Sequence, residues 1–253
     1  MANQKVYIHE LVEIIGSNRA KYMHHMSAVW AAVRRDHQQL QLGVWAEVGT
    51  TGNWPRVVNM WEHDGWEGLA FHLGYEASGK KSNQNSSLGT MEPEEADWWH
   101  EATAFRKGGR DRILVPTSWT RSVDELVADG VRGGLYAHER IWTDRNMSSD
   151  YIKLVEDRGL AAYAAHGLEV VGVYDNALIN GRESFAIWAI PDWSAWAAFE
   201  RAWSTDEALL AFRRGSEPFV DRFERRLLTD NPLNPMVIGR QPHESDRRPM
   251  SEL

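Results

Sequence analysis

A short pattern near the start of the sequence returns in its second half. The Tyr-x-His-Glu of "VYIHELVE" (residues 6–13) reappears in "LYAHERIW" (residues 135–142), at an offset of 129 residues. Three further pairs match in the same order: "HQQLQLGVW" with "HGLEVVGVY", "NMWEHDGWEGLAF" with "AIWAIPDWSAWAAF", and "RDRILVPT" with "DRFERRLLTDNP". A chain that matches itself repeatedly in this way is built from two copies of one folding unit.

Each copy is predicted to follow the order strand, helix, strand, strand, helix, strand. Alternating runs rich in β-branched residues indicate the strands, and apolar residues at helical spacing indicate the helices. In the first copy we expect strands at 4–14, 40–48, 55–63 and 110–118, with helices at 18–36, from Trp66, and after the polar stretch "SGKKSNQNSSLGTMEPEE". In the second copy we expect strands at 134–143, 168–177, 183–190 and 221–229, with helices at 148–165 and from 193 to about 220.

A four-stranded βαββαβ sheet carries its helices on one face and leaves the other face uncovered. An apolar face of that size must be buried against another surface. We therefore predict an α+β fold in which two tandem ferredoxin-like modules, at 1–120 and 133–236, close their bare faces on each other. The product is one barrel with the helices outside. The polar, proline-bearing residues 237–253 are expected to form a mobile tail.

Composition excludes several classes of function. The net charge of -8 argues against a nucleic-acid partner, which needs a concentrated basic surface. The chain has no cysteine, so it has no disulfide or thiolate metal site, which fits a reducing cytoplasm. No stretch approaches a membrane span, and the Rossmann, P-loop, G-x-S-x-G and H-E-x-x-H signatures are missing. We expect a cytoplasmic protein whose partner is a small molecule, and we leave a homo-oligomer open.

Alternation along each strand predicts which residues face the inside of the barrel. We assign the more uniformly apolar set of each strand to the helices and the other set to the lumen. The lumen set then contains Tyr7, His9, Leu11, Glu13, Gln41, Trp45, Glu47, Asn59, Trp61, His63, Tyr136, His138, Arg140, Trp142, Tyr174, Asn176 and Trp188. The repeated Glu10 and Glu139 fall on the helix-covered face, where we expect a structural role.

The repeated histidines, His9 and His138, are the candidate general bases of this lumen. A histidine near its ordinary pKa suits proton transfer at neutral pH. The alternative is a pair of hydrogen-bonded histidines inherited with the duplication. Either way, we expect the two rings to meet inside one cavity, one from each copy.

An apolar lumen with a few placed polar groups is typical of a small-molecule site. Tyr7, Tyr136 or Arg140 could stabilise negative charge on a substrate oxygen. Alternatively, the tyrosines fill the barrel and Arg140 pairs with Glu47, because an unpaired buried charge is costly. The predicted substrate-binding residues are Trp45, Glu47, Asn59, Trp61, His63, Trp142, Tyr174 and Trp188.

The stretch "LGVWAEVGTTGNWPRVVNMWEHDGW" resembles the NIPSNAP motif, in which a G-x-W strand precedes an N-x-x-x-x-x-W strand. "VYIHELVEII" occupies the opening position of that family. The resemblance covers residues 5–75 best and 133–199 more faintly. NIPSNAP-like modules belong to the dimeric α+β barrel superfamily, so the resemblance implies that one copy here replaces a partner subunit. The superfamily includes cofactor-free monooxygenases, isomerases, lactone-forming enzymes and haem enzymes similar to chlorite dismutases and aldoxime dehydratases.

Three functions remain open, because a fold does not choose a reaction. The first, implied by the resemblance, is an oxygenase that acts on a small, largely apolar, aromatic or polycyclic metabolite in the lumen, with residues 78–95 as a lid. The second is a haem-dependent oxidoreductase or dehydratase with His166 or His100 as axial ligand; His37 occupies the place of His166 in the first copy, which argues against that ligand. The third is a non-catalytic binding or scaffold protein, which predicts a collapsed lumen.

Overall fold

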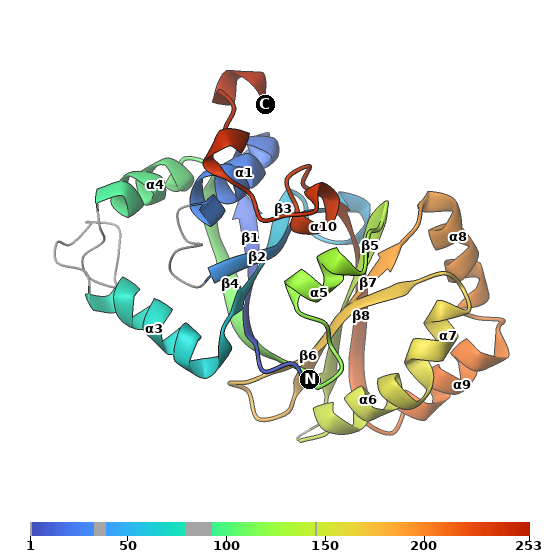
Figure 1. Cartoon of the computed structure of the whole chain (residues 1–253). Helices are drawn as coiled ribbons and strands as arrows, with labels where there is room; N and C mark the ends of the chain where they lie inside the picture. Colours follow the sequence, from blue (N-terminus) through green and yellow to red (C-terminus); the bar gives the residue numbers. More distant parts are fainter. Residues whose placement is uncertain (1, 33–38, 79–92, 145) are drawn as a thin grey trace.

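A closed antiparallel barrel of eight strands forms the centre of the protein, and helices lie outside it (Figure 1). The structure, a computed structural model, describes residues 2–32, 39–78, 93–144 and 146–253. The sequence predicted two ferredoxin-like halves that close into one α+β barrel, and this prediction is confirmed.

The first half supplies four strands and the helices that cover them. The strands are β1 (Val6–Ile14), β2 (Gln39–Glu47), β3 (Arg56–His63) and β4 (Arg106–Pro116). Helix α1 (Arg19–His24) continues as the π-helix η1 (His25–Ala31), and the short η3 (Gly49–Thr51), α3 (Gly65–Ser78) and α4 (Pro93–Thr103) follow. The end of the helix expected at 18–36, and most of the expected lid at 78–95, lie outside the described residues.

The second half repeats this order after a connecting helix, α5 (Val123–Ala128), which the sequence did not predict. Its strands are β5 (Leu135–Thr143), β6 (Glu169–Asn176), β7 (Glu183–Ile190) and β8 (Val220–Asp230). Its helices are α6 (Ser148–Leu154), the π-helix η4 (Val155–Gly159), α7 (Leu160–Ala164), α8 (Trp193–Ala202) and α9 (Glu207–Ser216). Both halves therefore carry a π-helical segment at the same place in the first helix.

The strand order around the barrel is β1-β3-β2-β8-β5-β7-β6-β4. Within each half the strands pair over most of their length, as β1 does with β3 and β4. The two halves join only at short seams, where Trp45 to Glu47 of β2 pair with β8, and Leu114 to Pro116 of β4 pair with β6. Such short seams leave most of the contact between the halves to side chains inside the barrel.

A β-bulge interrupts β2 between Gln41 and Gly43, and the same irregularity occurs in β6 before Gly172. A bulge adds one residue to a strand and so reverses which side chains point inward. The repeated glycines make room for the aromatic residue two positions later. A Cβ atom at Gly43 would lie 2.1 Å from the ring of Trp45, and one at Gly172 would lie 2.2 Å from the hydroxyl of Tyr174.

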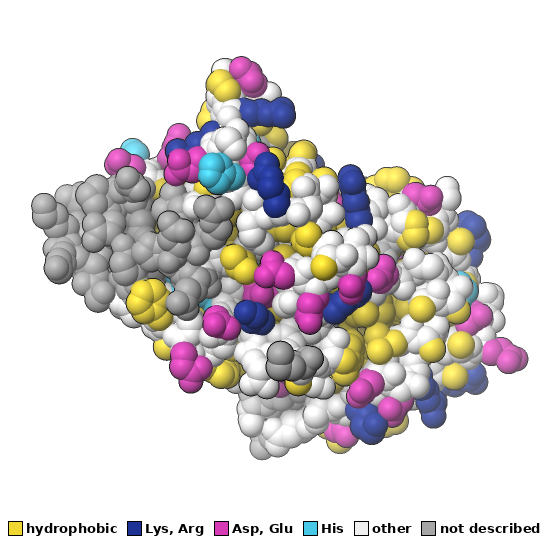
Figure 2. Space-filling model, in the orientation of Figure 1, with side chains coloured by type: hydrophobic (Ala, Val, Ile, Leu, Met, Phe, Trp, Pro, Cys, Tyr) yellow, Lys and Arg dark blue, Asp and Glu magenta, His cyan; other side chains and the backbone are white. Residues whose placement is uncertain are grey.

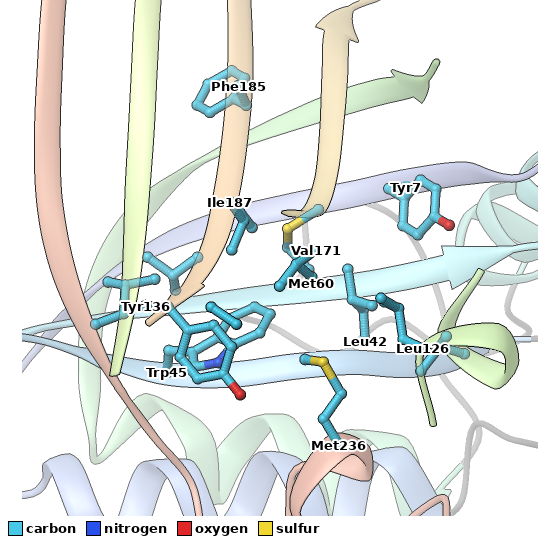
Figure 3. Packing of buried hydrophobic residues seen from close by; sticks show 14 of the residues in the cluster. Tyr7, Leu42, Trp45, Met60, Leu126, Tyr136, Val171, Phe185, Ile187 and Met236 are labelled. Atoms are coloured by element: carbon cyan, nitrogen blue, oxygen red, sulfur yellow. The ribbon is translucent and has the colours of Figure 1, made fainter. Parts of the chain in front are cut away.

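The inside of the barrel is a packed core over much of its length (Figure 3). Its members come from the strands of both halves, among them Tyr7, Leu42, Trp45, Met60, Tyr136, Val171, Phe185 and Ile187. One end is closed by α5 and by α10 (Pro235–Ile238), which insert Leu126 and Met236. The Ser122 side chain begins α5 with a capping box, so this plug is held at its start.

Residues 237–253, which we expected to form a mobile tail, lie beside α1 (Figure 1). The segment contains two short 3₁₀ helices, η5 (Glu244–Asp246) and η6 (Met250–Glu252). The backbone N–H of Arg248 donates to Nε2 of His24 at 3.0 Å, and Nε of Arg247 donates to the carbonyl of Ala28 at 3.3 Å. These contacts attach the end of the chain to the first-half helix.

Acidic and basic side chains interleave over the face shown in Figure 2, and neither kind forms a continuous patch there. None of the helices in the described part of the chain is both long and apolar enough to cross a membrane.

Candidate functional site

The two repeated histidines meet at the centre of the lumen. Nε2 of His9 lies 2.9 Å from Nε2 of His138, and the two rings stack with their centroids 5.0 Å apart. One imidazole donates and the other accepts, so at least one ring is neutral. The repeat predicted this meeting correctly. The catalytic role of the two histidines stays a prediction.

Burial lowers the pKa of both histidines. The pKa of His9 lies well below its ordinary value because of burial, with further contributions from His138 and Arg112. Burial and the charges of Arg226 and Arg112 lower the pKa of His138 to about 3. An imidazole with so low a pKa is a weak base at neutral pH, since an effective general base titrates near the working pH. We therefore interpret the pair as a contact between the halves.

Ion pairs between the halves surround this histidine pair. Arg112 of β4 donates to Glu183 of β7 through Nε at 3.0 Å, and Arg226 of β8 donates to Glu47 of β2 through Nη1 at 3.0 Å. Arg140 also pairs with Glu183, and burial is the main reason that its pKa falls to about 10. The sequence offered Glu47 as the alternative partner of Arg140, but Glu47 pairs with Arg226 instead.

The two lumen tyrosines hold the plugged end of the barrel. The hydroxyl of Tyr7 donates to Oε2 of Glu62 at 2.8 Å, and the same oxygen accepts the backbone N–H of Val123 at the start of α5. The hydroxyl of Tyr136 accepts the backbone N–H of Gly133 at 3.2 Å. Both rings are fully buried. These contacts favour the barrel-filling reading of the tyrosines.

Four predicted substrate-binding residues do not face the lumen. We placed Asn59, Trp61, His63 and Trp188 inside the barrel, and this placement is wrong. Trp61 packs with side chains of α1 and η1, and Trp188 packs with side chains of α6 and α8. Asn59 donates to the hydroxyl of Tyr22 on α1 at 2.9 Å. The prediction failed because the barrel is apolar on both faces, so an apolar set does not identify the helix side.

The other four predicted substrate-binding residues do face the lumen. Trp45 and Tyr174 are fully buried in its packed core. Glu47 forms an ion pair with Arg226, and the guanidinium of Arg140 lies 4.0 Å from the centroid of the Trp142 ring. Trp45 and Tyr174 contact the lumen tyrosines, Trp45 with Tyr136 at 5.7 Å and Tyr174 with Tyr7 at 5.0 Å between ring centroids.

A cavity of about 400 Å³ lies outside the barrel, between the first-half sheet and its helices. The sheet contributes Glu10 and Trp61, η1 contributes Trp30, and α4 contributes Trp98 and Trp99. Other lining residues are Ile8, Met26, Gln39, Leu69, His72, Leu73, Arg106, Asp111, Arg112, Ile113 and Leu178. The lining combines four tryptophans with the charged residues Glu10, Arg106, Asp111 and Arg112, and a cavity of this size is typical of a small-molecule site.

Glu10 is the polar group at the sheet side of this cavity. Its Oε2 accepts the indole N–H of Trp61 at 2.7 Å and the amide N–H of Asn59 at 2.9 Å. Asn59 also donates to Tyr22, whose pKa is raised by burial and by the charge of Glu10. Asp111 lies opposite Glu10 on β4 and lines the same cavity. The site therefore presents carboxylates on an aromatic wall.

The helix side of the cavity is held by stacked rings. Trp30 packs on Trp98 with centroids 4.1 Å apart, and His25 stacks on Trp98 at 5.1 Å. Nε2 of His25 lies 3.2 Å from the carbonyl of Trp98, so η1 and α4 are tied together. Trp30 and His25 belong to the π-helix, and π-helical segments occur often at functional sites.

The corresponding space in the second half is filled. Glu139 takes the place of Glu10, and its Oε2 accepts the indole N–H of Trp188 at 2.9 Å. Tyr163 stacks on Trp188 with centroids 4.1 Å apart and donates its hydroxyl to Oε1 of Glu139 at 2.9 Å. Arg225 pairs with the same Oε1 at 2.8 Å. The predicted structural role fits Glu139, whereas Glu10 lines a cavity.

The two haem-ligand candidates lie away from these sites. His166 lies 3.7 Å from a carboxylate oxygen of Asp206, and its ring packs edge-on against Phe199. His100 is exposed on α4. Neither imidazole lines the cavities described here, so these residues do not fit an axial haem ligand. His37 lies outside the described residues.

Sequence reasoning missed Trp30, Trp98, Trp99 and Arg106 as lining residues of one cavity. A signal was present, since "WWHEATAF" places two adjacent tryptophans on an otherwise polar helix. Within the described residues no group of three or more His, Asp or Glu side chains could hold a metal ion.

These features define an α+β barrel of two fused halves with a cavity between one sheet and its helices. No family model matches the sequence, and no curated protein matches it. An anthrone oxidase-like protein has a similar structure, with a TM-score of 0.60 and 9% identity over 91% of this chain and 94% of its own. A proposed monooxygenase from Lactobacillus acidophilus NCFM is similar at a TM-score of 0.57, with 10% identity over 90% of this chain and 94% of its own.

Solved structures similar to part of this chain include NIPSNAP family proteins, the family that the sequence resembles. One of unknown function, from Agrobacterium tumefaciens str. C58, is 20% identical over 42% of this chain and 96% of its own, with a TM-score of 0.38. At these identities the likenesses show the fold alone.

Proposed function

We propose that the protein is an oxygenase that binds a planar, largely apolar small molecule in the first-half cavity. The observation that carries the proposal is the cavity itself, about 400 Å³ in volume and lined by Trp30, Trp61, Trp98 and Trp99. Tryptophan faces suit stacking against a flat ring system. The choice of oxygen chemistry is motivated by the names of two proteins that share the fold, a proposed monooxygenase and an anthrone oxidase-like protein.

Glu10 is the base in this proposal, because its carboxylate lines the cavity and is fixed by Trp61 and Asn59. It removes a proton from a carbon that is activated by the ring system. The resulting anion is delocalised over the rings and gives electrons to O2, the oxidant. One oxygen atom enters the substrate and the other leaves as water, so a CH2 group and O2 become a C=O group and H2O.

The lumen histidines have a different role in this proposal. His9 and His138 hold the halves together and take no part in the reaction, because both are buried and have low pKa values. Their role as bases remains a prediction that the experiment below tests, and the roles of Tyr7, Tyr136 and Arg140 also remain predictions.

Anthrone is a suitable probe, since its oxidation to anthraquinone has this balance. We expect the protein to speed anthraquinone formation and O2 uptake above the rate in buffer alone. Glu10→Gln should lower the rate by about a hundredfold, the order of magnitude of general base catalysis. The double variant His9→Leu/His138→Leu should keep it. No acceleration by the wild type would refute the reaction. If Glu10→Gln keeps the rate and the double histidine variant loses it, the reaction takes place in the lumen instead.

A further inference from the structure

The two halves repeat not only a fold but also one carboxylate–indole pair. Glu10 and Trp61 in the first half correspond to Glu139 and Trp188 in the second, and in both pairs the indole N–H donates to Oε2 of the glutamate. The strand registers agree as well, since Glu10 lies opposite Asp111 of β4 and Glu139 lies opposite Arg225 of β8. The two sites can therefore be compared atom by atom.

In the second half, a phenol lies against counterparts of three cavity-lining residues, since Tyr163 contacts Glu139, Trp188 and Phe199. The ring of Tyr163 stacks on Trp188 with an interplanar angle of 28°, and its hydroxyl donates to Oε1 of Glu139. Nη2 of Arg225 lies 3.2 Å from the same hydroxyl. Tyr163 and Glu139 are both fully buried. The phenol thus has a stacking partner, an acceptor and a cation.

The neighbouring side chains differ between the halves in a consistent way. Gly159 on η4 replaces the cavity-lining Trp30 of η1, and a Cβ there would lie 3.1 Å from Phe212. Phe199 packs on Tyr163 at 5.1 Å, whereas the aligned position on α3 is His72, which lines the cavity. The second half is filled by its own residues, and the first half keeps its space. The residue that corresponds in sequence to Tyr163, Arg34, lies outside the described residues.

We infer that Tyr163 is a built-in occupant of the second-half site and shows what the first-half cavity binds. The ligand is a hydroxyarene, a planar ring that stacks on Trp61 and donates a phenolic hydroxyl to Oε1 of Glu10. Both described hydrogen bonds of Glu10 end on Oε2, so they match the bond that Trp188 makes to Glu139. This inference rests on the proposed function and names its substrate class.

Charge explains why a phenol is selected rather than any flat molecule. Hydrogen bonds to an ionised carboxylate are about twice as strong as those between neutral groups. A carboxylate on an aromatic wall favours a ligand that can donate to it over one that cannot. The same hydrogen bond holds the ring beside Glu10, the base that removes the carbon-bound proton in the proposed oxidation.

The test compares 2-naphthol with 2-methoxynaphthalene, which has the same rings but no hydroxyl donor. Isothermal titration of the full chain should show one 2-naphthol bound per chain, at least tenfold more tightly than the methoxy compound. In Glu10→Gln, the affinity for 2-naphthol should fall about tenfold, while that for 2-methoxynaphthalene stays unchanged. Glu67→Gln, an exposed residue in the first turn of α3 and outside the cavity lining, is the matched control and should change neither.

Each other outcome contradicts a defined part of the inference. If both compounds bind equally well, the cavity of the proposed function stands, but recognition of a phenol by Glu10 is refuted. If neither compound binds, the proposed function fails together with the inference. If the wild type binds two molecules of 2-naphthol per chain, the second half is not occupied by Tyr163, and the inference is wrong.

A second variant tests the occupant directly in the other half. Tyr163→Ala removes the phenol side chain and should let free phenol bind in its place. Isothermal titration with phenol should then count two bound molecules per chain instead of one. Tyr163→Phe keeps the ring and should remain at one. If Tyr163→Ala is folded and still binds one phenol, the second half is not a copy of the ligand site.

Discussion

Acid should separate the two halves of the barrel through the His9–His138 pair. In the unfolded chain each imidazole has an ordinary pKa of about 6.5. In the folded protein the pKa of His138 is about 3 and that of His9 also lies well below the ordinary value. Below pH 6.5 the unfolded state therefore binds protons that the folded state refuses. The stabilising contribution of the pair is complete above about pH 6.5 and is lost as the pH falls.

The size of the effect follows from proton linkage. For one histidine whose folded pKa lies far below 5, the free energy of unfolding falls by about 2 kcal/mol between pH 7 and pH 5. His138 therefore accounts for about 2 kcal/mol of the roughly 5–15 kcal/mol typical of a folded domain, and His9 contributes in the same direction. The neighbouring Arg112, Arg140 and Arg226 stay charged over this range and oppose protonation of either ring.

The assay is urea unfolding at pH 7 and pH 5, for the wild type and for His9→Leu/His138→Leu. Replacing both partners by apolar residues of similar size leaves no buried donor or acceptor unpaired, so we expect little change at pH 7. The variant should lose at least about 2 kcal/mol less than the wild type between the two pH values. His24 and His25 also have lowered pKa values, but they are present in both proteins and cancel. Equal losses in the two proteins would refute the reasoning.

Three further substitutions test the packing that positions the site. Gly43→Ala should destabilise the protein by about 1–3 kcal/mol in urea unfolding, because the new Cβ meets the ring of Trp45. Glu183→Gln should cost about 3–5 kcal/mol by the same assay, since it leaves the buried Arg112 without its counter-charge; a loss below 1 kcal/mol would show that the pair is screened. Ser122→Ala should lower the melting temperature through a loss of about 1 kcal/mol at the cap of α5, and Ser122→Asp should restore it.

The sequence predicted β1 and β5 correctly, down to the faces of their side chains. It failed on β3 and β7, where Met60 and Ile187 face the lumen instead of the helices. It also failed on the first part of β2 and β6, because a bulge before Gly43 and Gly172 reverses the alternation and brings Leu42 and Val171 into the lumen. A bulge has no signal in the hydrophobic pattern beyond the glycine itself. The sequence shows the glycine and the aromatic residue two positions later. It does not show that the aromatic side chain occupies the space where a Cβ of the glycine position would lie.

The site was predicted less well than the fold. We assigned the more uniformly apolar set of each strand to the helices and so placed Trp61 and Trp188 in the lumen. Both lie under the helices, with their indole N–H groups donating to glutamates. Glu10 and Glu139 were placed on the correct face, but their partners are 49 to 51 residues away in the chain. No local pattern predicts such partners.

The sequence alone determined that the chain is a duplication, that each copy is a βαββαβ unit, and that the copies close on each other with two histidines in contact. These features follow from periodicity and repetition, which are local properties of the chain. The tertiary structure decided which face of each strand is the lumen and which half keeps a cavity. Both depend on the volume of side chains such as Tyr163 and Trp30. These side chains lie on helices, outside the strands that they cover, and they pack on a sheet that is buried on both faces.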